Sequence, residues 1–235
     1  MAQANEVFNH KEIETRLFNY QASEVMENYK VRVANEAESK EAQELFVGVG
    51  FRTGKYKGHD GNKQKPEYRL WLNMVKRCYS ELTQKARPSY IGCSVSGNFA
   101  CYDYFYDWCQ SQIGFNKIGY QLDKDLLRKN NKIYSENDCV FLPSEINTAL
   151  ILRKSKRGDY PIGVTFCKRD NLYRSTLTMF GLNTNVGYFK DEKTAFNKYK
   201  EIKELYLKSL ANMYRDGIDE RAYKAHMEYE VSIDD

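Results

Sequence analysis

The chain has 235 residues, of which 42% are hydrophobic and 29% charged, and its formal net charge is +4. These proportions exclude a disordered or fibrous chain, because they supply enough apolar side chains for a packed core. Mean hydropathy is −0.72, no apolar run reaches the length of a bilayer span, and the polar N-terminus lacks the apolar stretch of a signal peptide. We therefore expect no membrane partner and a cytoplasmic location.

The six cysteines are irregularly spaced and form no CxxC pair. Such usage is typical of reduced thiols in an intracellular protein. Cys78, Cys93 and Cys139 are candidates for a structural zinc site, but their long separations favour buried free thiols instead.

Charge is distributed unevenly along the chain. Residues 1–50 carry 5 basic and 9 acidic side chains, whereas residues 51–110 carry 10 and 5. Residues 151–210 carry 13 and 6, and the last 25 residues carry 3 and 7. Basic blocks favour a polyanionic partner such as nucleic acid, because each neutralised phosphate releases counterions. A solvated lysine-rich surface is the alternative.

Residues 6–112 predict helices on either side of a loop. Residues 6–45 are rich in glutamate and lack glycine and proline, which favours surface helices. Five glycines in residues 46–66 predict a loop or irregular hairpin. Apolar residues at helical spacing then predict a buried helix from Tyr68 and a second helix over residues 98–112.

Residues 120–150 predict a strand, a polar turn, a second strand and a helix. Apolar residues from Tyr120 to Leu127 indicate the first strand, and Cys139 to Leu142 the second. Pro143 is suited to the first turn of the helix that follows. This is the order of a ββα unit.

Residues 161–210 predict three antiparallel strands and one helix. Alternation over Pro161–Lys168 and Tyr173–Met179, followed by a strand ending at Phe189, indicates the sheet. Asp191 is a suitable N-cap for the helix, which covers one face of the sheet. The uncovered face then carries Thr165, Cys167, Arg174, Thr176 and Thr178, with Arg169 at the hairpin tip. An ordinary solvated sheet face is the alternative interpretation.

The strings YPIGVTF (160–166), LYRSTLTM (172–179), VGYF (186–189) and DEKTAFNKYKE (191–201) resemble the plant ethylene-response-factor DNA-binding domain. That resemblance implies a three-stranded sheet that docks in the major groove of double-stranded DNA. Most of the family's arginines and tryptophans are absent here. The DNA-binding residues that it implies are Thr165, Cys167, Lys168, Arg169, Arg174, Thr176, Thr178 and Asn185.

The string LDKDLLRKNNKIYSENDCVFLPSEIN (122–147) resembles the HNH, or ββα-metal, nuclease motif of phage endonucleases. The resemblance implies a Mg²⁺ or Mn²⁺ ion held by Asp123 and Asn147, with Asn137 bracing the loop. Lys124 replaces the histidine that serves as general base, and a protonated lysine cannot take a proton. Asp125, two residues beyond Asp123 along the expected strand, is a candidate second metal ligand. A turn with surface charges is the alternative interpretation.

Further strings, including GVG (48–50), YRLWLNMVKRCYS (68–80) and YIGCSV (90–95), make the chain similar to a group of phage-encoded HNH-like proteins. The resemblance implies an α+β fold of N-terminal helices, a degenerate ββα-metal core and a C-terminal three-stranded antiparallel sheet packed on one helix. The expected divisions are an acidic helical segment (1–45), an HNH-like domain (46–152), an ethylene-response-factor-like domain (158–212) and an acidic tail (213–235).

Three functions follow as expectations. The first is a phage-encoded DNA-binding protein of HNH homing-endonuclease descent, with metal-dependent DNA nicking or cleavage as its candidate enzyme activity. The second is a DNA-binding regulator without catalysis. The third is a phage protein that inhibits a host enzyme, in which the acidic ends cover a basic surface on that host protein. The pattern predicts neither the DNA sequence recognised nor the oligomeric state.

Overall fold

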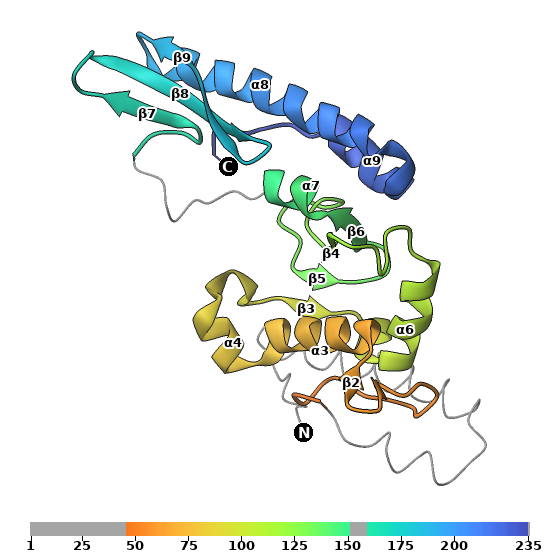
Figure 1. The fold of residues 1–235 in the computed structure, drawn as a ribbon. Coiled ribbons are helices and arrows are strands. Elements are labelled where there is room, and N and C mark those ends of the chain that lie inside the picture. Colours follow the sequence, from red (N-terminus) through yellow and green to blue (C-terminus); the bar gives the residue numbers. More distant parts are fainter. Residues whose placement is uncertain (1–45, 151–158, 235) are drawn as a thin grey trace, which may run out of the picture. The chain divides into compact units, whose positions relative to one another are not determined.

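The computed structural model describes residues 46–150 and 159–234 (Figure 1). The chain divides into two compact units. The first comprises residues up to Gln112 together with Asn130–Cys139, and the second comprises Ile113–Lys129 together with Val140 onward. The expected HNH-like domain, residues 46–152, thus contributes to both units, and the expected N-terminal helices lie outside the described residues.

The first unit is mainly helical. Its elements are β1 (His59–Asp60), β2 (Lys63–Gln64), α3 (Pro66–Tyr79), α4 (Glu81–Ala86), η1 (Pro88–Tyr90), β3 (Ser94–Val95), α5 (Gly97–Ala100), α6 (Tyr102–Ser111) and β5 (Ile133–Tyr134). Strands β1 and β2 form a short antiparallel hairpin, and β3 pairs with β5 in parallel. The irregular hairpin expected in the glycine-rich segment is therefore confirmed.

Helix α3 supplies much of the core of this unit. It begins at Pro66, two residues before the expected start, because proline is well suited to the first helical turn. Trp71, Met74 and Val75 are buried, as their helical spacing predicts. The Trp71 indole N–H donates to the Phe99 carbonyl oxygen at 2.9 Å, so the buried polar edge of the ring is satisfied.

The prediction of a single helix over residues 98–112 is wrong, because the helix is interrupted at Cys101. That residue is extended and forms a parallel bridge with Phe51. The Phe51 N–H donates to the Ala100 carbonyl oxygen at 3.0 Å, and the Tyr102 N–H donates to the Phe51 carbonyl oxygen at 2.9 Å. Backbone pairing with a distant segment therefore replaces one turn of helix and leaves α5 and α6 as separate helices.

The second unit combines a ββα arrangement with a separate sheet and two further helices. Its elements are β4 (Tyr120–Asp123), β6 (Val140–Pro143), α7 (Ser144–Ala149), β7 (Val164–Cys167), β8 (Leu172–Met179), β9 (Leu182–Phe189), α8 (Glu192–Met213), η3 (Arg215–Gly217) and α9 (Glu220–Met227). Strands β4 and β6 pair antiparallel, and α7 follows β6 directly. The first strand was expected to reach Leu127, but it ends at Asp123.

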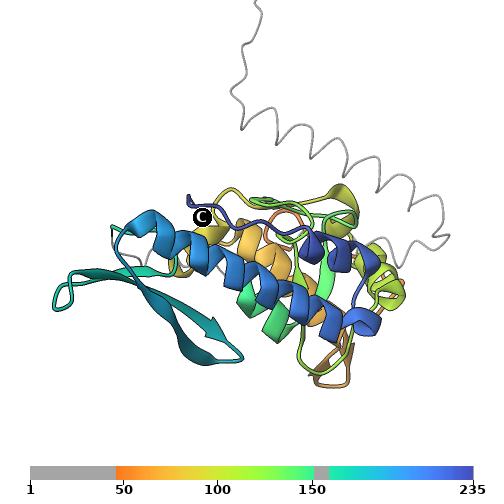
Figure 2. The same ribbon diagram turned by 90° about the horizontal axis from the view of Figure 1, so that it is seen from above.

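Strands β7, β8 and β9 form a three-stranded antiparallel sheet in that order, and α8 packs along one face of it (Figures 1 and 2). Asp191 caps α8, accepting hydrogen bonds from the Thr194 N–H and hydroxyl, both at 2.8 Å. The expected α+β class, the antiparallel sheet and the Asp191 cap are confirmed. Strand β7 starts at Val164, later than expected, because Gly163 adopts a φ of +78°.

The turn between β8 and β9 consists of Phe180 and Gly181, both with positive φ, which is the backbone of a type I′ hairpin. The turn was expected at Gly181 to Asn183, but β9 already starts at Leu182, within that expected turn. Tyr206 of α8 holds the hairpin in place. Its hydroxyl oxygen accepts a hydrogen bond from the Phe180 N–H at 3.0 Å, and the two rings meet edge to face with centroids 5.2 Å apart.

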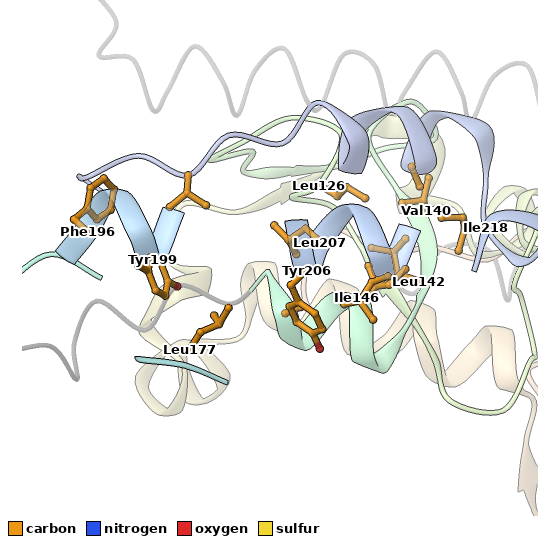
Figure 3. Packing of buried hydrophobic residues seen from close by; sticks show 14 of the residues in the cluster. Leu126, Val140, Leu142, Ile146, Leu177, Phe196, Tyr199, Tyr206, Leu207 and Ile218 are labelled. Carbon is orange, nitrogen blue, oxygen red and sulfur yellow. The ribbon is translucent and has the colours of Figure 1, made fainter. Parts of the chain in front are cut away.

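The acidic segment 213–235 contains helix α9, which packs against α8. Ala222 and His226 of α9 and Val231 beyond it are buried. Figure 3 shows the core of this unit, in which Leu177 of β8 faces the side chains of α8 and Ile146 and Leu142 lie near Leu207 and Tyr206. The sheet, α7, α8 and α9 thus share one hydrophobic cluster, and the C-terminal segment forms part of the fold.

Candidate nucleic-acid interface

The three-stranded sheet has one covered face and one open face. Val164, Ser175 and Leu177 are buried on the side of α8. Thr165, Arg174 and their neighbours alternate with them, because successive side chains of a strand point to opposite faces. Burial confirms the expected facing along β7 and β8, whereas contact of the open face with DNA stays a prediction.

The strand register places polar side chains of the open face in rows across the sheet. Thr165 of β7, Arg174 of β8 and Tyr188 of β9 form one row, because Arg174 is paired with both neighbours. The next rows pair Thr176 with Asn185 and Thr178 with Asn183. None of these seven side chains carries a negative charge.

Asn183 and Tyr188 were not predicted to belong to this face. Between Ser175 and Thr176 the register of β9 shifts, since Ser175 pairs with Gly187 and Thr176 pairs with Asn185. Val186 is therefore an extra residue, a β-bulge, and it places Asn185 and Tyr188 on the same face although they are three apart. Strict alternation from Asn185 would have assigned Tyr188 to the covered face.

The turn between β7 and β8 contains the predicted residues Lys168 and Arg169. The Arg169 guanidinium forms two hydrogen bonds with the Asp170 carboxylate, at 2.8 and 3.0 Å. The Cys167 thiol donates to the same carboxylate at 3.1 Å. The bond from Arg169 and, after it, the bond from Cys167 hold the pKa of Asp170 below its usual value. Asp170 thus offsets the charge of Arg169, while Lys168 is exposed and adds positive charge at the tip of the sheet.

Asp123, the predicted metal ligand, lies at the end of β4 and is buried. Its Oδ1 accepts hydrogen bonds from the Leu126 N–H at 2.8 Å and the Asp125 N–H at 3.0 Å. Burial raises the pKa of this carboxyl group above its usual value, against the opposing effect of these backbone bonds. Asp123 therefore stabilises the turn that follows the strand.

Asp125 lies in that turn and not in the strand, so the expectation that it shares a strand face with Asp123 is wrong. The turn forms because Asp123 supplies the acceptor for two successive N–H groups. Lys124, in the position of the general base, is buried and its Nζ forms an ion pair with Asp125 Oδ1 at 2.5 Å. The lysine thus neutralises the second candidate carboxylate.

The two predicted asparagines lie in different units. Asn137 is an exposed residue of the first unit, and Asn147 lies on α7 in the second. Asn147 donates to the Gln121 side-chain oxygen at 2.8 Å, so it contacts β4 two positions before Asp123. Across residues 46–150 and 159–234, no group of three histidine, cysteine, aspartate or glutamate side chains is placed to hold a metal.

These contacts do not fit a divalent ion at the predicted position. One oxygen of Asp123 is engaged by backbone donors, Asp125 is paired with Lys124, and Asn147 is bonded to Gln121. A hard cation such as Mg²⁺ needs oxygen ligands that converge on it. We therefore derive no metal-dependent step from this structure.

The histidines lie elsewhere. His59 is exposed on β1 of the first unit, His226 is buried in α9 of the second, and His10 lies outside the described residues. Five of the six cysteines, Cys78, Cys93 and Cys139 among them, are buried and form no disulfide bond within the described residues. Burial raises the pKa of Cys101 to about 12. Such a thiol stays protonated at neutral pH and is a poor nucleophile.

No protein-family model, curated protein or solved structure matches this chain. In the part of the chain that the structure describes, no helix has both the length and the apolar character needed to cross a membrane.

Proposed function

We propose that the chain binds double-stranded DNA through the open face of the sheet β7–β8–β9. The observation that supports this proposal best is the row of Thr165, Arg174 and Tyr188, which crosses all three strands on the uncovered side. With the two rows beside it, the face offers one guanidinium, two amides, three threonine hydroxyls and one phenol.

The dimensions of the sheet suit the major groove. Three strands about 4.8 Å apart span roughly 10 Å, whereas the groove of B-form DNA is about 12 Å wide and admits a β-ribbon. Three of the side-chain types have a matching base edge. Arginine pairs with guanine, asparagine with adenine, and the threonine methyl group contacts thymine. The face thus has both the size and the functional groups for reading bases.

Positive charge near the sheet provides contacts to the phosphate backbone. Residues 159–210 carry 9 basic and 6 acidic side chains, and Lys168 and Lys190 are exposed at the ends of β7 and β9. Contacts to phosphates position a protein on DNA, and contacts to base edges specify the sequence. We therefore propose a DNA-binding regulator.

Metal-dependent cleavage, implied by the resemblance of residues 122–147 to HNH nucleases, stays a prediction, and so does inhibition of a host enzyme. The order of β4, β6 and α7, with Asp123 at the end of β4 and Asn147 on α7, is the feature in favour of the nuclease. The ion pair of Lys124 opposes it, because that ammonium group replaces the base that would activate water.

Fluorescence anisotropy with a labelled duplex, measured over a salt series, tests the proposal. We expect the logarithm of affinity to fall linearly with the logarithm of salt concentration, because binding releases counterions. The absence of any binding at low salt would refute a DNA-binding function. Nicking of supercoiled plasmid with Mg²⁺ or Mn²⁺, compared between wild type and Asp123→Asn, separates a nuclease from a regulator.

A further inference from the structure

A basic pocket lies between helices α3 and α4 in the first unit. Ser80 ends α3 and caps α4, so the chain turns sharply there and the two helices enclose a hollow of about 500 Å³. The lining residues are Asn73, Lys76, Arg77, Leu82, Thr83, Ala86 and Arg87.

The three cations of this pocket form no ion pair with a carboxylate of the described residues. Within the described ranges 46–150 and 159–234, no carboxylate lies within ion-pair distance of Lys76, Arg77 or Arg87. Two of them instead contact aromatic rings. The Lys76 ammonium lies 5.7 Å from the centroid of Phe46, and the Arg77 guanidinium lies 5.2 Å from that of Tyr90.

Several cations elsewhere in the described residues do form ion pairs. Lys55, Arg169, Lys198, Arg215 and Arg221, for comparison, each lie within ion-pair distance of a carboxylate. Lys76 and Arg77 also lie in the last turn of α3, where the helix dipole favours positive charge. Arg87 is the C-cap residue of α4 and so lies at a second helix C-terminus. Cations from two helix ends therefore line the same hollow.

Uncharged donors accompany the cations. Asn73 adds a side-chain amide and Thr83 a hydroxyl to the lining. Two guanidinium groups, one ammonium group, an amide and a hydroxyl are the donors that recognise a tetrahedral oxyanion, and arginine in particular binds phosphate oxygens in pairs. We infer that this pocket binds a phosphate group, carried either by a small molecule or by a nucleic-acid backbone.

The test uses the full chain and two probes. Calorimetry measures binding of inorganic pyrophosphate, and anisotropy measures binding of a short duplex DNA, for wild type, Lys76→Gln and Arg87→Gln. Both residues are exposed, so we expect these variants to fold. The matched control is Lys85→Gln, which removes the same charge from α4 at an exposed position outside the pocket lining.

We expect each pocket variant to bind at least one probe tenfold or more weakly and Lys85→Gln to match wild type. Weaker pyrophosphate binding would identify a free phosphorylated ligand, and weaker DNA binding alone would identify the backbone phosphate as the source. Equal losses in Lys85→Gln, or no dependence of either probe on the pocket, would overturn the inference. Pyrophosphate binding should be unchanged in Arg174→Ala, which separates this site from the sheet face.

Discussion

Arg174 of β8 lies directly opposite Tyr188 of β9 on the open face of the sheet, and Thr165 of β7 lies opposite Arg174 on its other side. Arg174 therefore occupies the centre of a polar row that spans the full width of the sheet. A guanidinium in that position can contact either a guanine edge or a flanking phosphate when the sheet enters a groove. If the sheet binds DNA, we expect Arg174 to contribute more to the affinity than any other side chain of the open face.

Replacing Arg174 by alanine should weaken duplex binding by roughly 1–3 kcal/mol, because a charge-assisted contact to a base or a phosphate is lost. Arg174 is exposed, so the fold should be preserved. Anisotropy titrations measure the change, and Arg221→Ala is the control because Arg221 belongs to α9. Equal affinities of the two variants would show that the sheet face does not bind DNA.

Replacing Asp123 by asparagine should leave stability unchanged or raise it, whereas alanine should lower it. Burial raises the pKa of the Asp123 carboxyl group, so its ionised form costs stability at neutral pH. Asparagine removes the charge and keeps an oxygen that can accept from the Leu126 and Asp125 N–H groups. Alanine leaves the buried Leu126 N–H and the partly buried Asp125 N–H without that acceptor, at a cost of about 1–3 kcal/mol.

Urea unfolding followed by circular dichroism compares the two Asp123 variants. A lower midpoint for Asp123→Asn than for Asp123→Ala would mean that the charge itself is required at this position, as it would be in a metal site. The turn-stabilising role predicts the reverse order.

Replacing Gly163 by alanine should destabilise the sheet by about 2–4 kcal/mol, through backbone strain and overpacking together. Gly163 has a φ of +78°, and a β-carbon there would overlap the Tyr199 ring of α8. Gly181 is the matched control, because it has the same φ but no atom within 4 Å of its added β-carbon. Thermal unfolding should show a larger loss for Gly163→Ala than for Gly181→Ala. Equal losses would show that Tyr199 does not pack against the strand as described.

Acid should destabilise the second unit through His226. This imidazole is fully buried, and neither ring nitrogen has a hydrogen-bond partner among the described residues. Burial and, to a smaller extent, the charge of Lys203 lower its pKa from 6.5 to about 4. Below pH 6.5 the unfolded chain therefore binds a proton that the folded chain does not, so stability falls as pH falls toward 4.

The expected loss from this one group between pH 7 and pH 5 is about 2 kcal/mol. His226→Leu should remove this part of the pH dependence and should raise stability at pH 7, because two buried polar atoms without partners are eliminated. Urea unfolding at the two pH values measures both effects. If His226→Leu loses as much stability between pH 7 and pH 5 as wild type, His226 is not the cause of the acid destabilisation.

The alternation of polar and apolar residues predicted which side chains of β7 and β8 lie on the open face, because successive side chains of a strand point to opposite faces. Thr165, Arg174 and Thr178 are exposed and Leu177 is buried for that reason. Tyr188 was missed because the bulge at Val186 adds one residue to β9, and the sequence carries no strong local signal for it.

Other differences arise from contacts between segments that are distant in sequence. The break at Cys101 requires Phe51, 50 residues earlier, and the burial of His226 requires α8, against which α9 packs. Local spacing cannot report such contacts. The turn at Asp123 is a local feature, but its sequence, LDKDLL, also fits a continued strand, so the pattern alone did not decide between them.

Amide chemical-shift mapping with a short duplex tests the central claim most directly. We expect the largest shifts at residues of β7, β8 and β9 on the open face, with Arg174, Tyr188 and Asn185 among them, and small shifts along α9. Shifts confined to the helices, with the sheet amides unchanged at saturating DNA, would contradict the proposal that this face binds the double helix.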